Sequence, residues 1–236
     1  MDTALLLRQS EPFLHYVTQW EATLPTLPLA EVAQDPARVA LIAIDVTNGF
    51  CHEGPLASPR VKTIIAPIVR LMESAYRAGV RQFVLPQDTH DPDAVEFGQF
   101  PPHCVRGTAE AETVPEIKAL PFYSEMAVLP KNSINPGLNS GLEPWLQAHP
   151  HADTFIVVGD CTDLCTYQLA MYLRLRANAA QLRQRVLVPV DGVDTYDLPV
   201  ETARTIGAVP HPADLLHLVF LYSLMLNGVE VVRSIH

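Results

Sequence analysis

The sequence predicts an α/β protein: a single three-layer α/β/α domain built around a mostly parallel sheet. Apolar runs of strand length alternate along the chain with longer segments of helical periodicity, which is typical of parallel sheets covered by helices on both faces. The 236 residues are 48% hydrophobic and 18% charged, a composition that suits one domain with a large buried core.

The first half of the chain is expected to contain two core strands and one long helix. Residues 1–35 are interpreted as an N-terminal helical extension and linker, and residues 36–236 as the domain itself. Residues 38–45 and 81–85 are apolar runs that predict strands, and residues 61–78 between them have helical periodicity.

The second half begins with a loop over residues 86–115 that is rich in Pro, His and Asp. Loops of this length in compact domains are usually functional or disordered. The remaining elements are expected in this order: a short apolar segment at 126–129, a strand ending at Gly159, a helix at 163–180, a strand at 185–190, helices at 199–206 and 212–226, and a final strand at 230–235.

Cys165 has the position of a candidate nucleophile. The apolar run 154–158 stops at a Gly-Asp turn, and a helical pattern then begins at Thr162 or Asp163, either of which is a suitable N-cap. This places Cys165 in the first turn of a helix, at the carboxyl end of a buried strand. Free amides and the helix dipole favour a thiolate there, and open α/β sheets bind ligands at that edge.

Three more polar residues, Asp45, Asp88 and Lys131, follow apolar strands, and a parallel sheet would gather them beside Cys165. A carboxylate there can accept the thiol proton, and an ammonium can stabilise the resulting anion. Each residue also has an ordinary structural explanation: an Asp often forms a turn, a Lys is usually solvated, and a Cys can be a small buried hydrophobe. Spacing alone leaves both interpretations open.

The composition indicates which classes of partner and which cellular compartment to expect. The net charge of −10, without any block of like charges, argues against nucleic acid or an anionic membrane as the main partner. The chain contains no apolar stretch of the ~20 residues that span a bilayer, and its start lacks the pattern of a secretory signal. Four cysteines suggest no disulfide framework, so a reduced, cytoplasmic setting is expected.

Five segments form an ordered set of motifs: Ile44–Phe50, Gln87–His90, Phe100–Thr108, Pro130–Lys131 and Gly159–Cys165. Together they resemble the motifs of the isochorismatase-like cysteine hydrolases, and of nicotinamidases in particular. The resemblance runs from Asp45 to the C-terminus and leaves only the N-terminal extension uncovered. It implies a Rossmann-like topology and the hydrolysis of a small carboxamide.

The same resemblance implies roles for individual residues. Asp45 would be the general base and later the proton donor to the leaving amine, and Lys131 would hold charge near the thiolate. Cys165 would attack the amide carbonyl to form a thioester that water then hydrolyses. The oxyanion would lie against the backbone amides of Cys161 and Cys165, and the family often has a cis peptide bond just before Cys161.

The loop after Asp88 contains candidate metal ligands. Asp88 and His90 lie two apart, so a slight bend would aim both at one ion, and His103 could close the site. Such ligands suit Zn, Fe or Mn, although an Asp-x-His pair can also be a simple hydrogen-bonded turn. Glu96 matches a further acidic ligand of some nicotinamidases. In that family the ion binds the pyridine nitrogen and orients the amide; no organic cofactor is expected.

Thr89 weakens the case for a flat pyridine substrate, because it replaces an aromatic residue that the family often has between its metal ligands. Phe50 and Tyr167 are candidate substrate-binding residues that could supply this stacking instead, as are Phe100 and Tyr123. Nicotinamide is the leading substrate. The alternative is a metal-independent relative that hydrolyses a carbamoyl or ureido amide.

Two other classes of function compete with an enzyme. A small-molecule binder or interaction module could keep the fold, but the intact set Asp45, Lys131 and Cys165 argues against it. A nucleotide-binding domain is disfavoured because residues 45–49 lack a glycine-rich phosphate loop. Apolar residues in the last helix could serve the core or a subunit contact, and a homo-oligomer is expected.

Overall fold

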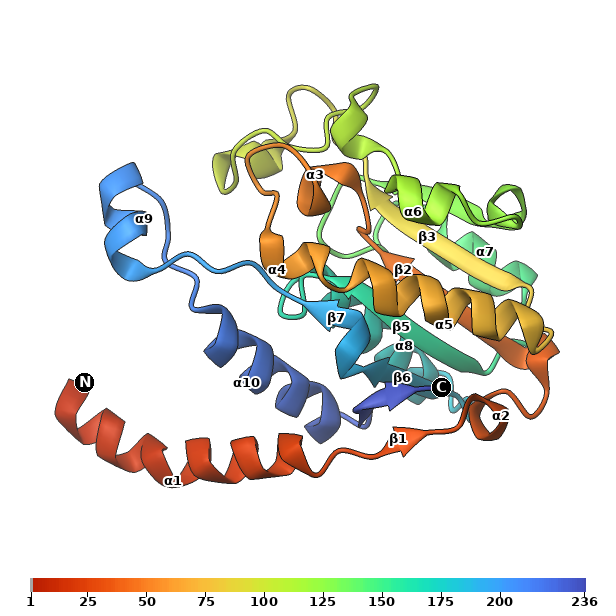
Figure 1. Ribbon diagram of the computed structural model, residues 1–236, viewed down its shortest axis with the longest axis horizontal. Coiled ribbons are helices and arrows are strands. Elements are labelled where there is room, and N and C mark those ends of the chain that lie inside the picture. The colour runs from red at the N-terminus through yellow and green to blue at the C-terminus, as the bar shows by residue number, and fades with distance from the viewer. Residues whose placement is uncertain (1) are drawn as a thin grey trace.

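The computed structural model describes residues 2–236 and has a parallel sheet at its centre (Figure 1). Its strand order is β4-β3-β2-β5-β6-β8, with β7 pairing with β5, and every pairing is parallel. This confirms the predicted α/β fold. The strands are β2 (Val39–Ile44), β3 (Gln82–Asp88), β4 (Ala127–Lys131), β5 (Thr154–Asp160), β6 (Arg185–Pro189), β7 (Val193–Asp194) and β8 (Glu230–Val232).

Helices cover both faces of the sheet, as the three-layer prediction requires. Alternate residues of β2 point to opposite faces: Leu41 packs with helix α5 (Ile65–Arg77), whereas Ile42 packs in the other core cluster. That second cluster contains residues of α7 (Leu142–Ala148), α8 (Cys165–Ala179) and α10 (Ala213–Leu226). The sheet is therefore buried on both sides, which explains its continuous apolar runs.

The N-terminal segment packs against the C-terminal elements. Helix α1 (Thr3–Ala22) lies along α10, where the ring of Tyr222 meets three aromatic rings of α1 at centroid distances of 5.3 to 6.0 Å. Strand β1 (Thr26–Leu27) pairs with β9 (Ser234–Ile235). The predicted single strand over 230–235 is thus two strands, because β8 joins the main sheet and β9 joins β1. The division of the chain at residue 35 stays a prediction.

Other boundaries differ locally from those expected. The predicted helix over 61–78 is divided into α4 (Pro59–Lys62) and α5, and β3 runs on to Asp88, so the long loop begins later. Helix α7 was not predicted, since seven residues are too few to show a clear period. The other short helices are α2 (Leu29–Val32), α3 (Asn48–Cys51), α6 (Pro115–Lys118) and α9 (Val200–Ile206). Among the described residues, none of the helices is long and apolar enough to cross a membrane.

The connections place a topological switch between β2 and β5. The chain runs from β2 outward through β3 to β4 and then returns to β5 on the other side of β2. Ligands bind at such a switch, outside the carboxyl ends of the strands. Gly159 lets the two strands approach here: its φ is +120°, and an added Cβ would lie 1.9 Å from the carbonyl oxygen of Ile44.

Candidate active site

Four polar side chains meet at the switch point. Asp45 follows β2, Asp88 and Lys131 end their strands, and Cys165 is the first residue of α8. Nζ of Lys131 lies 2.8 Å from Oδ2 of Asp45, 2.5 Å from Oδ1 of Asp88 and 3.5 Å from Sγ of Cys165. All four residues are buried. The structure therefore brings together the residues that strand-end positions predicted.

Asp45 is held by its backbone as well as by Lys131. Its φ of 55° lies in the left-handed region, which costs about 1–3 kcal/mol for a residue other than glycine. Its amide donates to the carbonyl of Pro86 at 2.9 Å, and its Oδ1 accepts from the amide of Asp88 at 2.8 Å. These contacts fix the direction of the carboxylate, and such strain at a buried polar residue points to function.

Burial and neighbouring charges set the ionisation of the cluster. Burial raises the pKa of Asp45 to about 6; the Asp88 carboxylate adds to this rise, and the charge and hydrogen bond of Lys131 oppose it. Burial also raises the pKa of the Cys165 thiol, against the pull of Lys131. Burial alone would lower the pKa of Lys131, but the two carboxylates raise it well above its usual value. A neutral thiol thus faces a carboxylate that ionises close to neutral pH.

The turn before Cys165 differs from the sequence prediction in one respect. Helix α8 begins at Cys165 and its N-cap is Leu164, with no side-chain cap, so the prediction of Thr162 or Asp163 as N-cap is wrong. Asp163 instead accepts hydrogen bonds from outside the turn. The Asp160–Cys161 peptide bond is cis, as the resemblance implied.

The backbone amides of Cys161 and Cys165 are free to bind an oxyanion. The Cys165 amide begins its helix and so lacks a helical partner. Among residues 2–236, neither of these two amides donates a hydrogen bond to a side chain. Neither donates to a backbone carbonyl in a turn or loop either. This availability fits the predicted oxyanion role, which stays a prediction.

Asp88, His90 and His103 form a cluster whose oxygen and nitrogen atoms lie within 4.8 Å of one another. Nε2 of His90 lies 3.5 Å from Oδ1 of Asp88, and Nε2 of His103 lies 3.8 Å from Oδ2. Burial alone would raise the pKa of Asp88, but Lys131 and the two histidines outweigh it, so this pKa is lowered and the group is a carboxylate. These residues can hold a divalent cation.

The surroundings of the two histidines favour this use. Nδ1 of His90 lies 2.8 Å from Oδ1 of Asn132, and Nδ1 of His103 lies 2.9 Å from the carbonyl of Pro101. Such contacts to Nδ1 orient the ring and leave Nε2 as the ligand atom. Nε2 of His90 is buried and has no hydrogen-bond partner among the described residues, which an ion would supply. Glu96 lies outside the cluster but lines the same pocket.

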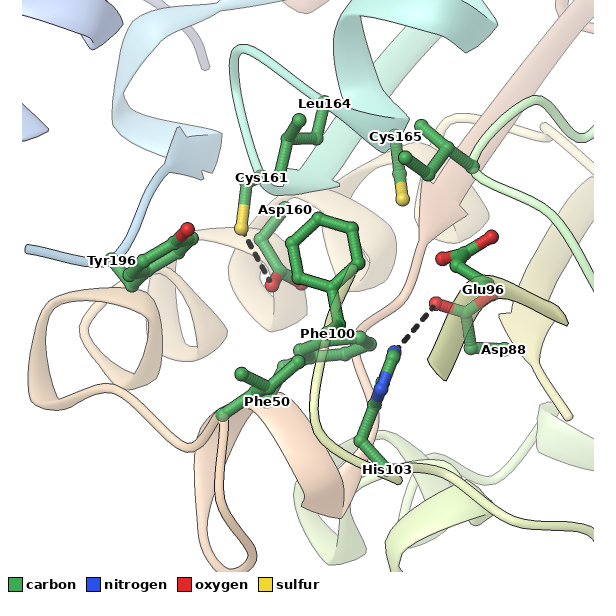
Figure 2. Close-up of a pocket in the computed structure, with 12 residues that line it drawn as sticks. Phe50, Asp88, Glu96, Phe100, His103, Asp160, Cys161, Leu164, Cys165 and Tyr196 are labelled. Atoms are coloured by element: carbon green, nitrogen blue, oxygen red, sulfur yellow. Dashed lines mark hydrogen bonds and ion pairs between the residues drawn. The ribbon is translucent and has the colours of Figure 1, made fainter. Parts of the chain in front are cut away.

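A pocket with mainly apolar walls opens in front of Cys165, as Figure 2 shows. It encloses about 400 Å³ not filled by atoms, part of it open to solvent, which suits a small molecule. In Figure 2, Cys161 and Tyr196 lie on one side, and Cys165, Glu96 and Asp88 lie on the other. Its walls comprise Phe50, Leu56, Asp88, Glu96, Phe100, His103, Ile134, Asp160, Cys161, Leu164, Cys165 and Tyr196.

Comparison with known proteins agrees with this geometry. The model of the isochorismatase domain matches residues 39–203. The chain belongs to the isochorismatase family. Nicotinamidase 1 of Arabidopsis thaliana is 33% identical to it over 218 residues, which cover 84% of this chain and 86% of that protein. The predicted family is thereby confirmed, and the protein is a cysteine hydrolase of that family.

Solved structures resemble this isochorismatase-family protein over most of its length. The N-carbamoylsarcosine amidase of Thermoplasma acidophilum superposes with a TM-score of 0.58 at 25% identity, covering 75% of this chain and 97% of its own. A pyrazinamidase of Pyrococcus horikoshii in complex with zinc gives a TM-score of 0.62 at 20% identity, covering 83% and 99%. At this lower identity the likeness shows the fold alone.

Of the two predicted substrate-binding residues of this isochorismatase-family protein, only one lines the pocket. Phe50 lines the pocket, with its ring 5.5 Å from that of His103. Tyr167 does not line this pocket, and its role as a substrate-binding residue stays a prediction. Two residues along a helix point to nearly opposite sides, so Tyr167 faces α10, where its hydroxyl lies 3.1 Å from that of Ser223.

Sequence reasoning missed several residues at the site, among them Phe97, Asp160 and Tyr196. The ring of Phe97 lies 5.4 Å from that of His90, because a short helical turn over Val95–Gly98 brings it beside the histidines. Asp160 lines the pocket, and burial raises its pKa well above its usual value. Tyr196 forms a wall from a distant part of the chain. Only Asp160, a polar residue within an apolar motif, left a signal in the sequence.

Lys131→Met is expected to destabilise the fold by about 3–5 kcal/mol, because it leaves the carboxylates of Asp45 and Asp88 buried without their cation. Denaturant unfolding measures this change. The control is Lys118→Met, which removes a half-exposed ion pair with Glu112 and should cost about 1 kcal/mol or less. Equal stability of the two variants would contradict the proposed charge balance.

Proposed function

We propose that this protein is an amidohydrolase that converts nicotinamide to nicotinate and ammonia through a thioester on Cys165. One observation carries the proposal. The Cys165 thiol, 3.5 Å from the Lys131 ammonium and within 4.8 Å of the Asp45 carboxylate, opens onto a pocket that Asp88 and His103 also line. Sequence identity of 33% to a plant nicotinamidase supports the choice of substrate.

The geometry supports a two-step reaction. Asp45 takes the thiol proton, and the Cys165 sulfur attacks the amide carbonyl while Lys131 balances the negative charge. The amides of Cys161 and Cys165 stabilise the oxyanion. Asp45 then donates its proton to the departing amine, which leaves as ammonia. It next accepts a proton from a water molecule that attacks the thioester, releasing the acid and the thiol.

Asp88, His90 and His103 would hold a divalent metal ion, with Glu96 as an additional candidate ligand. When bound, the ion supplies a Lewis-acid contact for a ring nitrogen of the substrate. Phe50 and Phe100 stand beside His103, at ring distances of 5.5 and 6.2 Å, and can pack against a flat ring. These two rings compensate for Thr89, where the family often has an aromatic residue.

Purified protein is expected to contain about one equivalent of Zn, Fe or Mn, and His103→Ala to reduce this content at least about tenfold, because one buried ligand is lost. Elemental analysis measures both. The control His149→Ala removes a histidine outside the cluster and should retain the metal. A metal-free wild-type protein, or full occupancy in His103→Ala, would refute the site.

Ammonia release from a panel of amides tests the substrate. We expect nicotinamide to be turned over faster than an N-carbamoyl amino acid. Turnover of the carbamoyl compound without any turnover of nicotinamide would replace the proposal by the alternative, a metal-independent hydrolase of a carbamoyl or ureido amide.

The proposal extends to compartment and assembly. All four cysteines are free thiols, which suits a reduced cytoplasmic setting. Apolar residues of α10 and α1 remain exposed, among them Leu215 and Leu7, which suits a homo-oligomer. The only partner we propose beyond a second copy is the small amide itself.

A further inference from the structure

A buried ion pair joins the nucleophile turn to the segment between β7 and α10. Nε2 of His211 lies 2.8 Å from Oδ2 of Asp163, and Oδ1 of the same carboxylate accepts from Oγ1 of Thr195 at 2.7 Å. Both members of the pair are buried. Asp163 lies two residues before Cys165, so this contact reaches the turn that carries the nucleophile.

His211 anchors the segment of residues 195–212, a long connection between β7 and α10 that we call the excursion. Leu198 and His211 close its base by exchanging both backbone hydrogen bonds at 2.8 Å. Beyond this base the excursion carries α9, which stands away from the sheet in Figure 1 and is mostly exposed. The Asp163–His211 pair is therefore a buried anchor for an otherwise exposed segment.

The hydrogen bonds of His211 require a doubly protonated ring. Nδ1 lies 2.8 Å from the carbonyl oxygen of Tyr196, and Nε2 faces Asp163, so both nitrogens meet acceptors. Burial alone would raise the pKa of Asp163, but its bonds to His211 and Thr195 lower it and keep the group ionised. The same carboxylate outweighs burial and raises the pKa of His211.

Asp163 and Tyr196 are the ionisable groups that face this imidazolium. Burial raises the pKa of Tyr196 to about 12, so its phenol is neutral. The two rings stack with centroids 3.9 Å apart and an interplanar angle of 18°. His211 thus holds both the carbonyl and the ring of Tyr196, which lines the pocket across from Asp88 in Figure 2.

We propose that the Asp163–His211 pair is a latch that holds Tyr196 in place as a wall of the pocket, so that His211 is a positioning residue for substrate affinity. The effect on a small planar amide rests on the proposed function. Within residues 2–236, no hydrogen bond or ion pair joins His211 to Asp45, Lys131 or Cys165. The latch therefore acts on KM, and kcat is largely preserved.

His211→Phe tests the latch, because phenylalanine keeps a stacking ring and removes both donors. The control is His149→Phe: His149 also stacks on an aromatic ring, that of Trp145 at 4.2 Å, and its Nδ1 lies 2.8 Å from a backbone carbonyl. His149 follows α7 and precedes β5, so it lies near the amino end of β5, whereas the active site lies at the carboxyl ends of the strands. We expect His211→Phe to raise KM for nicotinamide about tenfold or more with kcat within about twofold, and the control to change neither.

Two measurements test the latch without turnover. Hydrogen exchange should show that residues 195–212 lose protection in His211→Phe and keep it in His149→Phe. Ring-nitrogen NMR of the wild-type protein should show both nitrogens of His211 protonated at neutral pH. If the wild type does not hydrolyse nicotinamide, the proposed function fails, and these two measurements still decide the latch.

The outcomes that would overturn the latch are equally specific. They are an unchanged KM and unchanged protection in His211→Phe, a fall in kcat at constant KM, or a neutral His211 ring in the wild type. If His211→Phe does not fold, the NMR measurement on the wild type decides.

Discussion

Cys165→Ala is expected to lower the turnover of nicotinamide by about four orders of magnitude or more, because it removes the thiol that forms the thioester. Stability should change little, since Lys131 keeps both of its carboxylate partners. Steady-state ammonia release and thermal unfolding measure the two effects.

Cys161→Ala is the matched control for this variant. Cys161 lies in the same turn and lines the same pocket, but its proposed contribution comes from its backbone amide, which alanine retains. We expect Cys161→Ala to keep its activity within about tenfold of the wild type. A Cys165→Ala protein that retained a tenth of the wild-type rate would refute the covalent mechanism and favour a binding module.

Asp45→Asn is expected to lower kcat/KM by about two to four orders of magnitude, because it removes the group that accepts the thiol proton. The wild-type pH profile gives a second readout. Since burial raises the pKa of Asp45 to about 6, the carboxylate becomes protonated below that pH. The rate of the wild type should therefore rise with pH and reach a plateau above about 6, whereas Asp45→Asn should lack this acidic limb.

Asp160→Asn separates this effect from that of a second buried acid whose pKa is raised. Burial raises the pKa of Asp160 as well, and the residue lines the same pocket. We expect Asp160→Asn to retain the acidic limb whatever its effect on KM. Loss of the limb in Asp160→Asn, with its survival in Asp45→Asn, would transfer the role of the base to Asp160.

The fold could be predicted because its central strands β2 and β5 are fully buried and therefore continuous in hydrophobicity. The same reasoning placed Asp45, Asp88, Lys131 and Cys165 together, since parallel strands end at one edge. It failed where distant contacts decide the local structure. Asp163 has the character of an N-cap, yet tertiary hydrogen bonds to His211 and Thr195 claim its carboxylate.

The pocket walls were harder to predict than the reactive groups. Tyr167 and Tyr196 are both half-buried tyrosines. Tyr167 lies on a helix face that points away from the pocket, whereas the irregular segment that contains Tyr196 turns its side chain toward the pocket. Tyr196 depends on a stacked histidine 15 residues away, a contact without any periodic signal. Tertiary packing sets the direction of such side chains, and the sequence pattern predicts side-chain direction only in helices and strands.

The central claim is that Cys165 carries the acyl group of the substrate during the reaction. Intact-mass spectrometry of protein quenched in acid during turnover of saturating nicotinamide tests it most directly, with peptide mapping to locate any adduct. The mechanism predicts a nicotinoyl group on Cys165 in the wild type and in Cys161→Ala, and none in Cys165→Ala. An adduct on Cys161, or an adduct that persists in Cys165→Ala, would contradict it.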